Sequence, residues 1–137
     1  MIRFLVGYGG AALVFCALDA AWLTLTSASL YRPALAPLLA EQVRIVPAIL
    51  FYVVYLAGVT QFAVLPGARA RGWLTAASLG AAFGFVAYAT YDLTNQATLK
   101  LWATRITLLD LSWGAAVTAA GAAGGYFAIK LARLRPS

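Results

Sequence analysis

Four long stretches of apolar residues, separated by short polar connections, set the pattern of this chain. A helix needs about 20 residues to cross the roughly 30 Å of hydrocarbon in a bilayer, and each stretch is long enough. The pattern therefore predicts an all-α integral membrane protein, a four-helix bundle in one domain over residues 1–137. The helices are expected near residues 4–26, 45–65, 73–95 and 106–129.

Prolines, glycines and mixed polar segments mark the predicted helix ends. Pro47 falls in the first turn of the second helix, where its missing N–H costs little. Pro66 followed by Gly67 is expected to end that helix. The connections 27–44 and 96–105 mix apolar and basic residues, which predicts short segments at the membrane interface.

The composition supports insertion into a membrane and excludes several kinds of site. Hydrophobic residues make up 64% of the chain, which is far above their share in soluble proteins. The chain has no histidine and one cysteine, Cys16, so zinc sites, haem on histidine and Cys–His nucleophiles are excluded. We therefore expect no cofactor and no metal site.

The basic residues predict orientation rather than nucleic-acid binding. The net charge is +6, but the Lys and Arg residues stand at the ends of apolar stretches and form no basic face. With the N-terminus in the cytoplasm, the cytoplasmic side holds Arg3, Arg69, Arg71, Lys130, Arg133 and Arg135, and the opposite side holds Arg32, Arg44, Lys100 and Arg105. This excess predicts that both termini are inside the cell.

Only four acids occur in the chain, and three of them interrupt predicted membrane helices. Glu41 lies in a connection, whereas Asp19, Asp92 and Asp110 lie roughly 5 to 10 Å below the same membrane face, counted at about 1.5 Å per residue. A charge at mid-membrane costs on the order of 3 kcal/mol, and such residues face the protein interior or a wet cavity. The three aspartates are therefore predicted to meet in one layer inside the bundle.

Polar and aromatic residues at helical spacing accompany these aspartates. Residues 18–22 and 109–113 share the pattern Leu-Asp-x-x-Trp, which is too short to be treated as a repeat. Tyr52 and Tyr55 are assigned to the core or to hydrogen bonds between helices, with pocket lining as the less favoured alternative. The predicted ligand-binding residues of the layer are Asp19, Trp22, Arg44, Tyr88, Tyr91, Asp92, Asn95, Thr98, Lys100, Asp110 and Trp113.

Small residues recur four positions apart in the third and fourth helices. They are Gly80 with Gly84, Gly114 with Thr118, and Gly121 with Gly125. This spacing is typical of membrane helices that approach closely. It predicts tight packing, and it also offers glycine-rich faces through which a homodimer would form.

Several blocks of sequence carry a resemblance to a known family. They are ALDAAWL in the first helix, ILFYVVYLAGVTQFAVLP in the second, YDLTNQATL in the third and LLDLSWG in the fourth. With them the chain resembles a family of small bacterial membrane proteins catalogued as domain of unknown function 2177. The resemblance implies a four-helix, multi-pass protein of the bacterial inner (plasma) membrane, and it implies no established activity.

Three functions follow from the layer of aspartates, and the sequence leaves them open. In the first, the layer is an outward-facing polar pocket that binds or passes a small ligand, a cation or a proton. In the second, the carboxylates pair with Arg44, Lys100 or Arg105 as a helix clamp, and the protein is an accessory to another, unidentified membrane protein. In the third, two carboxylates act as acid and base on a lipid-soluble substrate. No nucleophile or cofactor motif accompanies them, so an enzyme is not favoured.

Overall fold

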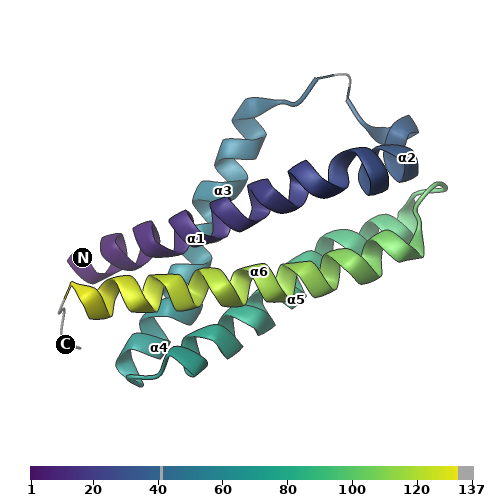
Figure 1. Ribbon diagram of the computed structural model, residues 1–137. Helices are drawn as coiled ribbons and strands as arrows, with labels where there is room; N and C mark the ends of the chain where they lie inside the picture. The colour runs from purple at the N-terminus through teal and green to yellow at the C-terminus, as the bar shows by residue number, and fades with distance from the viewer. Residues whose placement is uncertain (41, 133–137) are drawn as a thin grey trace.

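Four helical runs make up nearly all of the chain in the computed structural model, which describes residues 1–40 and 42–132 (Figure 1). The runs are Ile2–Leu38, Ile45–Arg69, Trp73–Thr98 and Thr104–Leu131. Each is long and apolar enough to cross a membrane. The predicted all-α membrane architecture with four spans is therefore confirmed.

The first two runs are composite, because each contains a π-helical turn just before a proline. The first run consists of α1 (Ile2–Thr26), the π turn η1 (Ser27–Tyr31), α2 (Arg32–Leu35) and the 3-10 turn η2 (Ala36–Leu38). The second consists of α3 (Ile45–Val59), the π turn η3 (Thr60–Val64) and α4 (Leu65–Arg69). In both π turns the backbone N–H bonds lengthen to the fifth residue back, which makes room for a proline ring in the next turn.

Two predicted boundaries are wrong. Pro66 does not end the second span, because it sits in the first turn of α4, where its missing N–H costs little and the preceding π turn relieves the clash of its ring. The helix instead continues to Arg69. The third connection is also shorter than predicted, since α5 (Trp73–Thr98) and α6 (Thr104–Leu131) leave only residues 99–103 between them.

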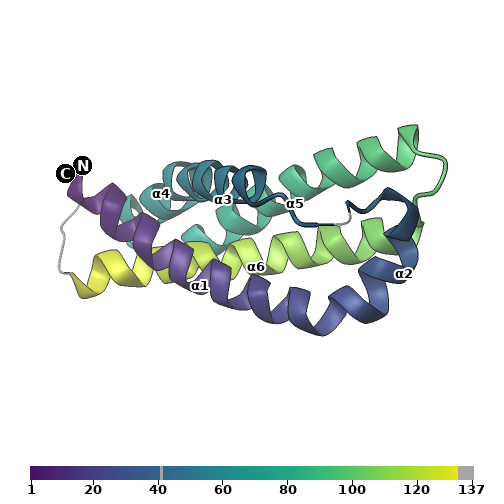
Figure 2. The same ribbon diagram turned by 90° about the horizontal axis from the view of Figure 1, so that it is seen from above.

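The central helix of the molecule is α6. It packs against α1 and α5 and runs antiparallel to both (Figures 1 and 2). Glycines allow these contacts: a Cβ added at Gly10 of α1 would lie 2.9 Å from the carbonyl oxygen of Gly124, and one at Gly80 of α5 would lie 2.7 Å from that of Thr118. The tight packing predicted for the small-residue faces thus occurs between helices of one chain.

The second span is packed differently from the others. It crosses them and makes most of its contacts through η3 and α4, whereas the N-terminal part of α3 diverges from α5 (Figure 1). Along α3, Ile49, Leu50 and Val54 are exposed. This half of the span therefore stands between the other helices and the surrounding lipid.

The outer surface differs from that of a soluble protein, because it is largely apolar like the core. Leu, Ile, Val and Phe side chains cover much of the outer surface. The buried polar residues are Asp19, Thr60, Asp92, Thr107, Asp110 and Thr118. An apolar exterior around a partly polar interior is suited to hydrocarbon, where each buried polar group needs a partner inside the protein.

Replacing Gly84 by Ala tests the contact between α5 and α6. The added methyl group would overlap the carbonyl oxygen of Gly114 and the side chain of Thr118, so we expect a loss of about 1–3 kcal/mol of stability. Gly9→Ala is the matched control, because nothing lies within 4 Å of its added Cβ. Thermal unfolding in one detergent, followed by circular dichroism, compares the two; equal midpoints would contradict this account of the packing.

Candidate functional site

The three aspartates lie in the half of the molecule away from both chain termini, and all three are buried. Asp19 belongs to α1, Asp92 to α5 and Asp110 to α6. Their side chains are 7%, 0% and 9% exposed, respectively. Because the spans alternate in direction, the C-terminal parts of α1 and α5 and the N-terminal part of α6 come to the same end of the molecule (Figure 1). The fourth acid, Glu41, and the basic residues Arg133 and Arg135 lie outside the described residues.

Asp19 joins three helices through hydrogen bonds from aromatic side chains. The hydroxyl of Tyr52 in α3 donates to Oδ2 at 2.6 Å. The indole N–H of Trp113 in α6 donates to Oδ1 at 3.3 Å. Tyr55, one turn after Tyr52, shares a hydrogen bond of 2.7 Å with the hydroxyl of Thr118. The assignment of both tyrosines to hydrogen bonds between helices is thus confirmed.

Asp110 is bound by Tyr31, the last residue of the π turn η1. The Tyr31 hydroxyl donates to Oδ1 of Asp110 and accepts a hydrogen bond of 2.9 Å from the indole N–H of Trp22. The phenol therefore bridges an indole on α1 and a carboxylate on α6. Tyr31 is not among the residues that the sequence predicts for the site.

The two Leu-Asp-x-x-Trp segments face each other across the antiparallel pair α1 and α6. The rings of Trp22 and Trp113 stack with their centroids 4.5 Å apart and their planes 9° from parallel. Trp113 then reaches Asp19 directly, whereas Trp22 reaches Asp110 through the Tyr31 hydroxyl. Antiparallel helices with equal spacing from acid to indole allow this reciprocal contact, so the echo in the sequence has a counterpart in the fold.

Asp92 differs from the other two aspartates because neither of its oxygens has a hydrogen-bond partner among the described residues. Both oxygens are buried. Leaving a buried acceptor unsatisfied costs about 1–3 kcal/mol, and more if it carries a charge. A buried group of this kind calls for an explanation in terms of function or of a bound species.

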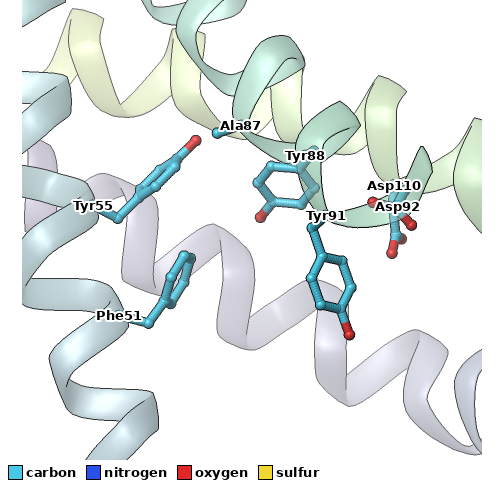
Figure 3. Close-up of a pocket in the computed structure, with 7 residues that line it drawn as sticks. All are labelled: Phe51, Tyr55, Ala87, Tyr88, Tyr91, Asp92 and Asp110. Carbon is cyan, nitrogen blue, oxygen red and sulfur yellow. The ribbon is translucent and has the colours of Figure 1, made fainter. Parts of the chain in front are cut away.

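Asp92 and Asp110 line a pocket of about 390 Å³ between α3 and α5. Figure 3 shows the rings of the two helices facing each other, with both carboxylates at one end. At the mouth, Phe51 is 44% exposed and Tyr91 is 61% exposed, so in a bilayer the pocket opens toward lipid. The lining residues are Phe51, Tyr55, Ala87, Tyr88, Tyr91, Asp92 and Asp110.

A second set of hydrogen bonds fixes the connection between α5 and α6 next to this pocket. The Thr107 hydroxyl donates to Oε1 of Gln96 at 2.7 Å, and the indole N–H of Trp102 donates to Thr107 at 3.0 Å. Thr107 is one turn before Asp110. These bonds therefore hold the ends of the two helices that carry Asp92 and Asp110.

Several predicted site residues lie apart from the pocket. Arg44, Thr98 and Lys100 are exposed, and Asn95 is half-buried outside the pocket lining. In the described part of the chain, the donors to Asp19 and Asp110 are tyrosine and tryptophan side chains rather than basic ones. Long basic side chains near helix ends extend toward the aqueous phase, which is consistent with this placement.

A known protein family matches almost the whole chain. A family model described as "Predicted membrane protein (DUF2177)" matches residues 4–127, a stretch that includes all three aspartates and every residue of the pocket lining. The resemblance inferred from the sequence blocks is therefore confirmed. No curated protein and no solved structure matches the chain.

Removing the Tyr31 hydroxyl tests the bridge to Asp110. We expect Tyr31→Phe to cost about 1–3 kcal/mol of unfolding free energy, because the buried carboxylate and the Trp22 indole both lose a partner. Tyr8→Phe is the control, since its hydroxyl makes only an exposed hydrogen bond of 3.5 Å. Denaturant titration of both variants gives the comparison.

A double variant shows whether the Tyr31 effect passes through Asp110. If it does, Tyr31→Phe combined with Asp110→Asn loses less stability than the sum of the two single changes, because the second change acts on a bond already absent. Strictly additive losses would mean that the two residues are not coupled.

Proposed function

The chain belongs to the DUF2177 family of predicted membrane proteins, and from the contrast between its buried aspartates we propose that it binds a small ligand at Asp92. The observation behind the proposal is that the two oxygens of Asp92 are buried without partners at one end of an aromatic pocket. A ligand that carries a hydrogen-bond donor or a positive charge would supply the missing partner.

The other two aspartates support this division of roles. Asp19 and Asp110 accept hydrogen bonds from residues on neighbouring helices, as a helix clamp requires. The clamp hypothesis is therefore favoured for these two residues, with tyrosine and tryptophan in the place of the predicted basic partners. Asp92 contributes no such bond, so a role in holding the fold does not account for it.

The position of the pocket favours a ligand that reaches the protein through the bilayer. Its mouth lies between α3 and α5, where Phe51 and Tyr91 are exposed on a surface otherwise covered by apolar side chains. Apolar walls with a few polar groups are typical of small-molecule sites. With both termini in the bacterial cytoplasm, as the basic residues predict, the pocket lies in the outer half of the inner membrane.

Binding accounts for the lining better than catalysis does. None of the described residues that line the pocket is a serine, threonine, cysteine or lysine, so covalent catalysis through such a nucleophile has no support. The proposal therefore gives the two carboxylates of the lining a binding role.

Substituting Asp92 tests whether this residue serves ligand binding or belongs to the helix clamp. Asp92→Asn should fold with unchanged or higher thermal stability, because it removes a buried acid that has no partner. Asp19→Asn should lose about 1–3 kcal/mol, because an amide NH₂ would face the donors Tyr52 and Trp113. Thermal unfolding of both variants in the same lipid nanodiscs measures this difference; equal destabilisation would assign Asp92 to the clamp.

Chemical modification tests whether Asp92 is reached from the lipid. Dicyclohexylcarbodiimide, which dissolves in membranes and reacts with carboxyl groups there, should modify Asp92 in folded protein, whereas a water-soluble carbodiimide should not. Mass spectrometry of peptides identifies the modified residue, and Asp92→Asn is the control. Modification of Asp92 only after unfolding would contradict a pocket open to the bilayer.

A further inference from the structure

The pocket lining carries acidic groups and no basic ones. Asp92 and Asp110 both face it, and its described lining includes neither Lys nor Arg. The predicted basic partners of this layer, Arg44, Lys100 and Arg105, are exposed. Because charges interact strongly where water is excluded, this lining disfavours an anion and favours a cation.

The aromatic walls favour the same sign of charge. Tyr55 lies 5.2 Å from Phe51 and 6.4 Å from Tyr88 between ring centroids, so rings from α3 and α5 line the pocket, with the two carboxylates at one end (Figure 3). The face of an aromatic ring attracts a cation by about 0.5–2 kcal/mol, with the larger values in desolvated sites. The carboxylates and the aromatic rings therefore both favour a cation.

The walls suit an organic cation better than a metal ion. Calcium takes about six to eight oxygen ligands and magnesium about six, with water completing the set. The described residues contain no group of three or more His, Cys, Asp or Glu side chains placed to hold a metal. Most of the lining is ring and methyl surface, which makes favourable contact with apolar substituents.

We infer that the ligand is a lipophilic organic cation, such as an amine or a quaternary ammonium or phosphonium ion with apolar substituents; this inference rests on the proposed function. Its charged centre lies against the free oxygens of Asp92, and its substituents lie between the rings of α3 and α5. Asp110, which accepts a hydrogen bond from the Tyr31 hydroxyl at Oδ1, also lines the pocket and adds to its acidic character. A volume of about 390 Å³ falls at the lower end of the range for small-molecule sites.

Two ions of matched shape and opposite charge test whether the ligand is a cation or an anion. Tetraphenylphosphonium and tetraphenylborate are titrated into the protein in nanodiscs, and empty nanodiscs give the partition into lipid. We expect saturable binding of the phosphonium ion to the wild-type protein and no protein-dependent binding of the borate. Asp92→Asn should weaken phosphonium binding roughly tenfold or more, since a desolvated charge contact is lost.

Two variants that each remove one aromatic ring test whether the pocket walls contribute to binding. Tyr91→Leu removes a ring at the pocket mouth and should weaken phosphonium binding roughly threefold, whereas Phe85→Leu removes an exposed ring of α5 outside the lining and should leave binding unchanged. Both positions are exposed, so neither change is expected to unfold the protein. Equal effects of the two changes would overturn the role assigned to the aromatic walls.

The outcomes separate this inference from the proposed function. Asp92-dependent binding of the borate would overturn the cationic class and leave the pocket in place. Phosphonium binding that Asp92→Asn does not weaken would also overturn the cationic class alone. The same holds if neither ion binds while dicyclohexylcarbodiimide still modifies Asp92. Absence of both ion binding and modification would overturn the proposed function as well.

Discussion

A carboxylate surrounded by hydrocarbon needs a partner, and this requirement governs the arrangement of the whole interior. Asp19 and Asp110 meet it with hydroxyl and indole donors from other helices, which join α1 to α3 and α6 on one side and the π turn η1 to α6 on the other. Asp92 does not meet it within the described chain. The fold thus uses two of its buried acids to hold helices together and leaves the third without a partner beside a pocket.

Aromatic donors satisfy these acids without bringing a second charge into the membrane. Tyrosine and tryptophan present a large apolar body and one polar tip, so a single side chain fills space between helices and caps a carboxylate. A buried salt bridge would instead require two ions to lose their hydration. The stacked indoles Trp22 and Trp113 illustrate this, because both fill the α1–α6 interface. The N–H of Trp113 points to Asp19, and that of Trp22 points to the Tyr31 hydroxyl.

The sequence predicts the spans and the acidic end of the molecule, because apolar length and alternating direction determine both. It does not predict the role of Tyr31, because this residue lies in a π turn, where the helical spacing used to assign residues to one face no longer holds. The passage of a helix through Pro66 depends on a π turn in the same way. Which aspartate lacks a partner is equally hidden, since the donors to the other two lie 33, 79 and 94 residues away in the chain.

The pocket lies beside the N-terminal part of α3, because the glycine of α3 that approaches α5, Gly58 against Phe83, comes only near the end of that helix. Contacts of α6 with α1 and α5 occur at Gly10 and Gly80, where the helix backbones approach too closely to admit even a methyl group without displacement. Along the N-terminal part of α3, by contrast, long aromatic side chains such as Phe51 and Tyr55 separate the backbone from its neighbours. Large side chains hold the backbones apart there, whereas glycine faces bring them together. Under the proposed function, a ligand would enter beside α3 without separating α6 from α1 or α5, and it would meet the unpartnered carboxylate of Asp92 at one end of the pocket.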